Sequence, residues 1–491
     1  MRRNLRNLII VAVCIAVLGG ALLTLKLTGN DQAASSSVSS TANIELVSKT
    51  REDVASMTVE NEKGSYTIVP LEKPVASSSS QTVLENVSSS ASSDASDEII
   101  YTIKELSGCP INTSATESAV SYGFSLVASK NLGTVSNLED YGLDNPQATV
   151  KVRFKDGSSY NYKIGNPSPT NSSMYYMCGL DSNQVYIVPI DEGLLEGPEY
   201  YVSKEILSIT NSDGDNVFTK ITLSGSNYPE PITFSGDEED LKITSPASYE
   251  AEPDILYDIK SDLTSLTANE VVAVNPDEAA LEQYGFNNPT AVAVFTVNGD
   301  TYTLTVGAED DDSYYVMLDG VNVVYKVSAY SIKSWALQNL FALRSKFILQ
   351  PNIETVKGLT IVSGGTEHVL NIERTKNEEK STEDKTYYDY KLTGNGGKSL
   401  DYDTNYKNFY EKLIGITILE DAKENPEGDP VFTVKYQYFD DSKTDTIEFY
   451  QSGDRRYTAV LNGQIYGIVT QDDIDTLSNS ITALENGEEV S

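Results

Sequence analysis

The 491-residue chain is predicted to adopt an α+β fold made mainly of antiparallel β-hairpins with a few helices, in three tandem repeated units that follow one N-terminal transmembrane helix. A block of motifs that recurs at a constant spacing predicts the repeated units. Alternation of apolar and polar residues on either side of turn signals predicts the hairpins. An uncharged stretch near the N-terminus predicts the membrane helix.

The recurring block starts with a Tyr-Gly turn ahead of a proline and ends with a short strand that carries a tyrosine. The prolines stand at positions 146, 289 and 430, and the closing tyrosines stand at positions 186, 325 and 466, so the spacing is nearly the same at both landmarks. The third copy is degenerate because it has no Tyr-Gly turn. The copies contain, in order, Tyr141–Pro146 with Val185–Val188, Tyr284–Pro289 with Val324–Val327, and Pro430 with Arg456, Tyr457 and Ile465–Ile468.

A hairpin is predicted inside each block. The first turns at Asp156-Gly157, and the second spans 291–306 around Asn298-Gly299. The third spans 432–449 and has a longer turn. An Asp-Gly or Asn-Gly pair between segments of period-two patterning predicts an antiparallel hairpin with one packed and one solvated face. In the first hairpin the residues that alternate with polar ones are Ala148, Val150, Val152, Phe154, Tyr160, Tyr162 and Ile164.

The Tyr-Gly turn has a structural interpretation. Leu138 to Tyr141 make about one helical turn, Gly142 takes the left-handed position that ends it, and Pro146 prevents its continuation. The same interpretation covers 281–289. The turn therefore needs no ligand to explain it.

Helices are predicted from apolar stripes at helical spacing and from a capping box. Each unit is also expected to open with a strand pair, at 54–69, 206–234 and 353–372, and to close with a helix. The helical residues are Tyr406, Phe409, Tyr410, Leu413 and Ile414; Ile255, Ile259, Leu263 and Leu266; and Thr470 with Asp473 ahead of Ile474, Leu477 and Ile481.

Residues 8–25 form an 18-residue stretch without a charge, preceded by Arg2, Arg3 and Arg6. This is close to the roughly 20 apolar residues of a membrane-spanning helix, and the arginines favour a cytoplasmic location for residues 1–7. A cleaved signal peptide is the alternative, but its apolar region is usually about 7 to 15 residues long. We therefore expect an uncleaved, single-pass anchor in the cell membrane, with the bulk of the chain extracytoplasmic.

Outside the anchor, the chain is divided into a linker and three units. Residues 26–45 contain a Ser/Ala-rich tract and are expected to form a flexible linker. The repeat units are assigned to 46–202, 203–345 and 346–485. The first unit includes a Ser-rich tract at 76–97, which is interpreted as a disordered insert because strand-like sequence flanks it.

Composition excludes several functions. A net charge of 36 − 72 = −36 disfavours contact with phosphate backbones, so no nucleic-acid partner is expected. The single histidine, His368, lies in strand-like sequence and is expected at a strand surface rather than in a catalytic or metal site. Cys109 and Cys178 are either bonded or free, because nothing in their spacing decides between the two.

The sequence has no motif that indicates reaction chemistry. The segment 394–399 looks like a phosphate loop, but Leu392 stands where the leading glycine is required. Asp310–Asp312 and Asp213–Asp215 are candidate calcium ligands, with solvated turns as the simpler interpretation. We therefore predict that the chain is not an enzyme and has no cofactor, catalytic residue or metal site.

Tyrosine is over-represented, with 31 residues against 12 phenylalanines. Candidate binding residues lie on corresponding strands, so one tyrosine of each pair is expected to face solvent, where it could stack on a sugar or bind a partner strand. Cross-strand packing on a half-solvated sheet is the simpler explanation. These residues are Tyr175, Tyr176, Tyr314, Tyr315 and Tyr457.

In combination, these motifs resemble a bacterial family of domains of unknown function, the family numbered 4340. The resemblance rests on the Tyr-Gly-Leu-x-x-Pro turn, the hairpin, Gly165 and Gly307 at the end of its second strand, the Tyr-Tyr strand and the closing strand. It covers essentially the whole extracytoplasmic part. The resemblance implies a single-pass envelope protein, and some members are encoded beside ABC-type transport or gliding-type export components. It brings no catalytic residue.

Two functional hypotheses follow. The first is a non-enzymatic, membrane-tethered interaction or scaffold protein of the bacterial envelope, accessory to an ABC-type transporter. The second is an extracytoplasmic protein that binds a glycan, a peptide or Ca²⁺. A hydrolase with an acidic pair is a third hypothesis, for which the sequence singles out no pair.

Overall fold

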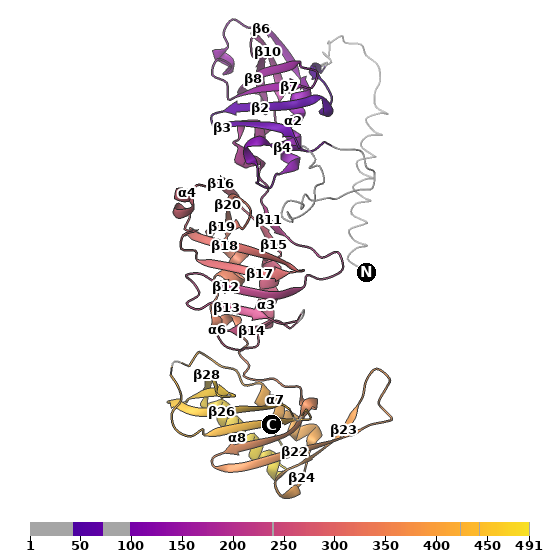
Figure 1. Ribbon diagram of the computed structural model, residues 1–491, viewed down its shortest axis with the longest axis vertical. Helices are drawn as coiled ribbons and strands as arrows, with labels where there is room; N and C mark the ends of the chain where they lie inside the picture. Colours follow the sequence, from indigo (N-terminus) through magenta and orange to yellow (C-terminus); the bar gives the residue numbers. More distant parts are fainter. Residues whose placement is uncertain (1–42, 72–98, 238–239, 423, 441, 491) are drawn as a thin grey trace, which may run out of the picture.

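The computed structural model describes residues 43–71, 99–237, 240–422, 424–440 and 442–490. Within these ranges the chain forms three eight-stranded antiparallel sheets, here called sheets I, II and III (Figure 1). The predicted anchor at 8–25, the insert at 76–97 and nearly all of the linker at 26–45 lie outside the described residues. Inside the described ranges, no helix combines the length and the apolar character needed to span a bilayer.

Sheet I has the strand order β4-β3-β2-β7-β8-β9-β10-β6, and a separate ladder joins β1 to β5. One α-helix and several 3₁₀ turns connect these strands. The bounds are β1 Ile44–Ser48, η1 Arg51–Asp53, β2 Val54–Asn61, β3 Gly64–Pro70, β4 Tyr101–Ile103, η2 Lys104–Leu106, α2 Thr113–Phe124, β5 Ser125–Ala128, β6 Lys130–Thr134, η3 Glu139–Tyr141, β7 Ala148–Phe154, β8 Ser159–Ser168, β9 Asn171–Gly179, β10 Gln184–Pro189, η4 Glu192–Leu195 and η5 Pro198–Tyr201.

Sheet II repeats this arrangement with the order β14-β13-β12-β17-β18-β19-β20-β16 and a ladder of β11 with β15. The bounds are β11 Glu205–Ser208, β12 Phe218–Ser224, β13 Ile232–Ser235, β14 Lys242–Ser245, α3 Pro253–Asp262, β15 Ser265–Thr267, β16 Glu270–Val274, α4 Glu278–Gln283, β17 Ala291–Val297, β18 Asp300–Asp310, β19 Ser313–Leu318, β20 Val323–Ser328, η6 Ala329–Ile332, α5 Lys333–Ala336 and α6 Leu340–Leu343.

Sheet III has the order β24-β23-β22-β21-β25-β26-β27-β28. A π-helical turn, η9, leads into helix α7, and the long helix α8 ends the described chain. The bounds are η7 Ile353–Thr355, β21 Val356–Ser363, β22 Thr366–Lys376, β23 Tyr388–Thr393, η8 Asn395–Gly397, β24 Ser399–Leu400, η9 Tyr402–Tyr406, α7 Lys407–Ile414, β25 Phe432–Tyr438, β26 Thr444–Gly453, β27 Arg456–Leu461, β28 Gln464–Thr470 and α8 Gln471–Asn486.

In the described chain, seven strands occupy the same positions in all three sheets. The run from β4 to β10 in sheet I corresponds to β14 to β20 in sheet II and to β23 to β28 in sheet III. Sheet III differs at its edges. Its counterpart of β6 and β16 is reduced to a bridge between Glu420 and Ile468, and β24 is added at the opposite edge.

The predicted hairpins are confirmed. Strand β7 pairs with β8 across the turn at Gly157, which has a φ of 85°. Strand β17 pairs with β18 across Asn298 (φ 52°) and Gly299 (φ 89°), and positive φ at both central residues is what a two-residue hairpin turn of this type requires. The third hairpin joins β25 to β26.

Four details of the sequence prediction are wrong. Leu266 lies in β15 rather than in a helix. Ile206 belongs to β11, which pairs with β15 and not with the β12–β13 pair. His368 is buried in β22, with Nδ1 3.6 Å from a carboxylate oxygen of Glu485, instead of lying at the surface. A long closing helix follows sheet III only, since short helical turns follow sheets I and II.

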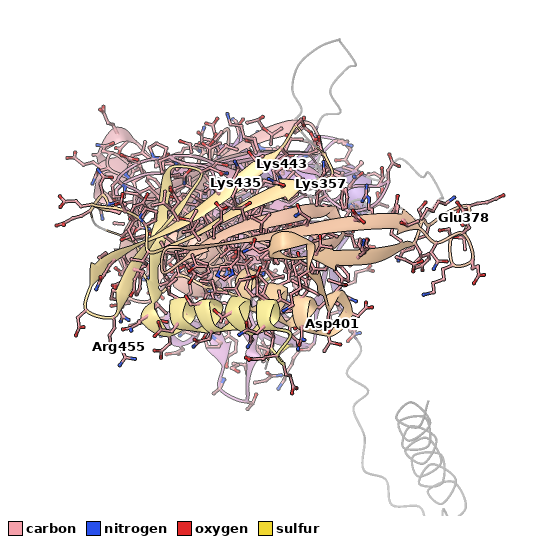
Figure 2. The ribbon with its side chains drawn as sticks, turned by 90° about the horizontal axis from the view of Figure 1, so that it is seen from below. Lys357, Glu378, Asp401, Lys435, Lys443 and Arg455 are labelled. Carbon is pink, nitrogen blue, oxygen red and sulfur yellow. The ribbon has the colours of Figure 1, made fainter. Side chains whose placement is uncertain are left out.

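Helices pack against each sheet, with α2 in contact with β2, α5 with β17 and α8 with β28. Figure 2 shows a helix beneath sheet III, while Lys435 and Lys443 lie toward the opposite side. The buried face of α8 presents Ile474, Leu477 and Ile481 to the core, as the stripe predicts. Sheets I and II share one continuous hydrophobic core, and sheet III has a separate one.

The sheets are stacked edge to edge along the molecule (Figure 1). At the first junction the segment after β4 meets sheet II, where Asn275 Nδ2 donates to the Glu105 carbonyl at 3.4 Å. At the second junction the segment after β14 meets β28, and the rings of Tyr249 and Tyr466 lie 5.5 Å apart. At each junction the segment after one edge strand meets the next unit, next to β16 at the first junction and at β28 at the second.

Candidate functional site

The Tyr-Gly turn packs against the second strand of its own hairpin. Gly142 ends the turn with a left-handed φ of 68°, as predicted. The carbonyl oxygen of Tyr141 then lies so close to Gly165 that a Cβ at this glycine would overlap it. In sheet II the same relation holds between Tyr284 and Gly307. Close backbone approach thus explains the glycine of the motif without a ligand.

The turn also accounts for the second tyrosine of each Tyr-Tyr pair. The ring of Tyr176 packs edge-on against Tyr141, with centroids 4.9 Å apart. The ring of Tyr315 lies 4.7 Å from Tyr284. The Tyr315 hydroxyl donates to Asp310 Oδ2 at 2.8 Å. Two pieces of the repeated motif are therefore in contact with each other.

The other predicted tyrosines, Tyr175, Tyr314 and Tyr457, each stand opposite a valine on the neighbouring strand. Tyr314 is 8% exposed, while Tyr175 and Tyr457 are half-buried. The structure does not bring the five candidate tyrosines together, because they lie in three different sheets. The opposing valines are Val188, Val327 and Val469, respectively.

The candidate calcium ligands have other roles. Asp310 accepts from Lys326 Nζ at 2.7 Å, and the hydrogen bonds from Lys326 and Tyr315 lower the pKa of its carboxyl. Asp213 lies in the turn bridged by Asn211 and Gly214. In the ranges that the structure covers, no three His, Cys, Asp or Glu side chains are grouped closely enough to hold a metal ion. Cys109 and Cys178 are buried and unbonded.

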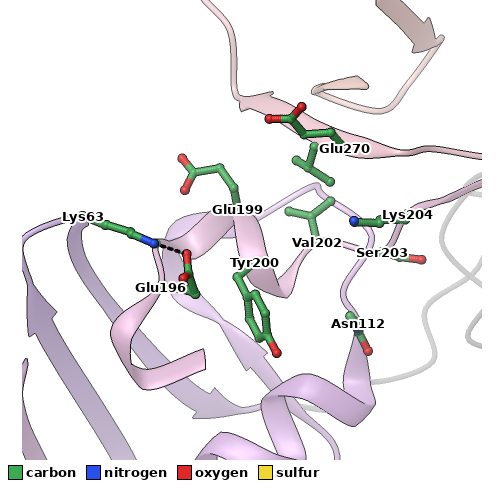
Figure 3. A pocket seen from close by; sticks show the side chains of 11 residues that line it. Lys63, Asn112, Glu196, Glu199, Tyr200, Val202, Ser203, Lys204 and Glu270 are labelled. Atoms are coloured by element: carbon green, nitrogen blue, oxygen red, sulfur yellow. Dashed lines mark hydrogen bonds and ion pairs between the residues drawn. The ribbon is translucent and has the colours of Figure 1, made fainter. Parts of the chain in front are cut away.

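A groove of about 610 Å³ lies at the junction of sheets I and II (Figure 3). Its walls are η5 and the segments that flank it in the first unit, and the start of edge strand β16 in the second. A groove between two packed units is a common location for ligand sites. The lining residues are Lys63, Asn112, Glu196, Gly197, Glu199, Tyr200, Val202, Ser203, Lys204, Glu270 and Val271.

The wall that the first unit contributes to the groove is fixed by contacts beneath η5. Pro198 starts η5, and Val202 bridges to Ile111. Below η5 the buried hydroxyls of Tyr66 and Tyr201 are 2.8 Å apart, and that of Tyr66 lies 2.9 Å from the carbonyl oxygen of Gly193, to which it donates. Buried hydrogen-bonded groups of this kind fix the orientation of the exposed residues above them.

Charges of both signs line the groove. Lys63 is paired with Glu196, and Lys204 Nζ donates to the Asn269 carbonyl at 2.8 Å. The carboxylates of Glu199 and Glu270 project into the open part of the groove from the two different units (Figure 3). Taken together, the lining holds three carboxylates and two ammonium groups.

Tyr200 is the aromatic element of the groove. It is 46% exposed, whereas its neighbour Tyr201 is fully buried. The two rings pack edge-on with centroids 5.2 Å apart. Desolvation raises the pKa of the Tyr200 phenol, and the negative charges of Asp191, Glu192 and Glu196 add to this effect.

A buried arginine occupies the second junction. Arg344 is 1% exposed there, and its guanidinium lies 4.6 Å from the ring centre of Tyr249 and 5.1 Å from that of Tyr466. It donates to the Tyr466 carbonyl at 2.6 Å and pairs with Asp421. A buried arginine between aromatic rings thus joins the second junction, whereas the groove described above lies at the first.

A family model described as a domain of unknown function, DUF4340, matches residues 101–241 and 242–430. The chain belongs to the DUF4340 family. Both DUF4340 matches begin at corresponding edge strands, the first at β4 and the second at β14. A DUF4340 match therefore spans the end of one sheet and the start of the next. Neither the curated proteins nor the solved structures contain a match to this chain.

Sequence reasoning missed the groove. Its residues come from around positions 63, 112, 196–204 and 270, and none of them belongs to the repeated motif. The one available signal was the cluster of acids and tyrosines at Glu196–Tyr201, which falls outside the period-two pattern. The contact of this segment with β16 depends on how the two units pack. The order of residues within one segment carries no information about that packing.

Proposed function

We propose that this chain is a non-enzymatic, membrane-tethered interaction or scaffold protein of the bacterial envelope, accessory to an ABC-type transporter. In this proposal residues 8–25 anchor it in the cell membrane with the N-terminus in the cytoplasm, and the sheets lie outside. The observation that carries the proposal is the edge-to-edge stack of three sheets with a groove at the first junction. Such a stack offers a long, fixed surface to a partner.

The proposal includes a third copy of the repeat at the C-terminal end. It is supported by the seven strands that sheet III shares in order with sheets I and II. The absence of a Tyr-Gly turn in this copy is consistent with the reduction of its β6 counterpart to a single bridge. The third copy would then extend the stack and close it with the added strand β24.

Co-purification after mild crosslinking tests the proposal. The full-length chain, isolated from membranes of its host, should bring down the same membrane protein in repeated experiments. A chain that starts at residue 43, ahead of β1, should lose the membrane fraction but keep its fold. Repeated recovery of no membrane partner by the full-length chain would count against the proposal.

A second candidate function is ligand capture by the extracytoplasmic part, and the groove beside Tyr200 is the observation in its favour. Thermal-shift measurements with cell-wall glycan fragments, cell-wall peptides and Ca²⁺ test this alternative. A binding ligand raises the melting temperature because it stabilises only the folded state. A flat response to all three would end it.

A further inference from the structure

The closing tyrosine of the repeated motif has a different environment in the first unit. Tyr325 is fully buried and Tyr466 is 3% exposed, whereas Tyr186, at the same position of the motif, is half-buried. Burial and, beyond it, the nearby Cys109 of the first unit raise the pKa of Tyr325. The ring of Tyr466 lies 5.5 Å from that of Tyr249 in the second unit. Within the described residues no sheet precedes sheet I, so no preceding unit covers Tyr186.

The surface around Tyr186, here called the open edge of sheet I, consists of the edge strand β6, Asn183 and the start of β10. Strand β6 ends the strand order of its sheet as β16 does in sheet II, and both ladders have a bulge at the same motif position. In sheet II this edge belongs to the first junction, and in sheet III the end of the strand order, β28, belongs to the second. The open edge is therefore a surface whose counterparts serve twice as an interface inside the chain.

The two internal junctions show which groups bind to such an edge. The Gln464 side chain donates to the Ser248 carbonyl of the second unit at 3.4 Å, and Gln184 holds the motif position of Gln464 in the open edge. At the first junction Asn275 donates to a backbone carbonyl in the same way. At the second, the guanidinium of Arg344 lies 5.1 Å from the ring centre of the closing tyrosine. Such an edge thus binds a segment that offers backbone carbonyls together with a ring or a cation.

The chain enters the first unit beside the open edge. Strand β1 starts at Ile44 and pairs with β5, which contacts β10. Residues 26–43 separate β1 from the proposed anchor, and an extended segment of this length spans at most about 65 Å. Sheets II and III lie farther along the stack, with sheet III at the end opposite to β6 and β10 (Figure 1). The open edge is therefore the end of the stack that the proposed anchor holds close to the membrane.

A second copy of the chain does not fit the open edge as a preceding unit does. It would have to present the outer edge of its sheet III, where the added strand β24 follows the counterpart of β4 and β14. Two copies would also bring together net charges of −36 each, which repel. A membrane protein beside the anchor meets neither obstacle.

We propose that the open edge of sheet I binds an extracytoplasmic loop of the membrane partner in the way that its counterparts bind the preceding unit. A backbone carbonyl of the loop accepts a hydrogen bond from the side-chain amide of Gln184. An aromatic or basic side chain of the loop covers the ring of Tyr186. This inference rests on the proposed function, since it names the surface that the membrane partner contacts. The contact is separate from the groove at the first junction.

Photo-crosslinking of the full-length chain in membranes of its host tests this contact. A benzoylphenylalanine is placed at position 183, where Asn183 is exposed on the open edge. We expect one discrete product that contains a membrane protein. The same group at position 257, which is 74% exposed on α3, should not give this product.

A conservative variant locates the effect. Gln184→Glu keeps the size of the side chain and replaces the amide donor with a carboxylate. Recovery of the membrane partner by co-purification should fall by about tenfold, because a carbonyl of the loop then loses its donor. The matched control is Gln437→Glu, at an exposed position of β25 in sheet III, which should leave recovery unchanged. Circular dichroism should show that both variants keep the fold.

Several results would overturn the inference. They are no product from position 183, products of equal yield from positions 183 and 257, or unchanged recovery of the partner by Gln184→Glu. A product from position 183 that contains only two copies of this chain would assign the open edge to self-association instead.

Failure of this inference is separable from failure of the proposed function. Co-purification is run in parallel with the unaltered chain and with the Gln184→Glu variant. A membrane partner recovered equally by both shows that the scaffold function stands and that the open edge is not its contact. No partner with the unaltered chain rejects the function itself, and the inference with it.

Discussion

Many tyrosines of this protein lie in its hydrophobic core and donate a hydrogen bond at the edge of that core. A buried phenol contributes a large apolar ring, and its hydroxyl reaches a backbone acceptor at the rim of the core. The Tyr410 hydroxyl donates to the Pro351 carbonyl at 2.7 Å, and the Tyr101 hydroxyl to that of Arg51 at 2.5 Å. Such tyrosines therefore have a structural role in the core. Tyr200 differs from them because its ring is exposed.

Burial of these phenols predicts a loss of stability at alkaline pH. Desolvation raises the pKa of Tyr101, Tyr160 and Tyr466 to about 12, against an ordinary value near 10. A raised folded-state pKa gives stability that is complete below pH 10 and is lost as the pH rises toward 12. The tyrosinate absorbance of the buried phenols should therefore appear together with the loss of β-sheet circular dichroism between pH 10 and 12. Full ionisation near pH 10 with the sheets intact would contradict this.

The motif glycine gives a prediction at the same scale. Gly165→Ala forces a Cβ against the Tyr141 carbonyl and should lower the free energy of unfolding by about 2 kcal/mol, because a backbone atom cannot move away cheaply. Urea unfolding followed by circular dichroism measures this. Gly179→Ala is the control, since its Cβ would meet only ordinary contacts. The fluorescence of Trp335, buried in the second unit, serves as an internal reference.

Among the secondary-structure elements, hairpins were predictable and several connections were not. The residue pairs Asp156-Gly157 and Asn298-Gly299 favour a hairpin turn by themselves, so the sequence predicts these turns. The apolar stripe of α7 likewise predicts a helix. Helix α2 went unpredicted because its Ser- and Thr-rich sequence has only a weak apolar stripe. Leu266 matched a helical spacing, but pairing with β11 holds it in a strand instead. Tertiary contacts decide such short segments.

The capping box of α8 gives a prediction for an element. Thr470 Oγ1 accepts from the Asp473 amide at 3.2 Å, and an Asp473 carboxylate oxygen accepts from the Thr470 amide at 2.9 Å. Thr470→Ala should destabilise the helix by about 1 kcal/mol. Hydrogen exchange of the amides in the first turn of α8 should become faster. Thr476→Ala, at an exposed position inside the same helix, should leave exchange unchanged.

At the scale of the whole molecule, the sequence could not predict how the units contact one another at the two junctions. The constant period indicated repeated units, but it contained nothing about their contact. The groove depends on η5 approaching β16, two segments that are distant in the sequence and belong to different units. Of the three aromatic rings around Arg344, only that of Phe341 is near it in the sequence, and those of Tyr249 and Tyr466 are distant.

Removal of Arg344 should free sheet III from the stack. Arg344→Met deletes a buried cation that holds the Tyr466 carbonyl and Asp421, and we expect about 3 kcal/mol of coupling between the sheets to be lost. Distances between spin labels on sheets II and III should broaden, while sheet III stays folded on its own core. Arg455→Ala, which removes an exposed pair with Asp472, is the control. An unchanged distance distribution in Arg344→Met would show that other contacts fix the junction.

The central claim is that the first junction holds a protein partner, and photo-crosslinking in host membranes tests it most directly. A benzoylphenylalanine placed at position 200, in the groove, should yield one discrete crosslinked membrane protein. The same group at position 257, which is 74% exposed on α3, should not yield that product. A crosslink of equal strength from both positions, or none from position 200, would contradict the claim.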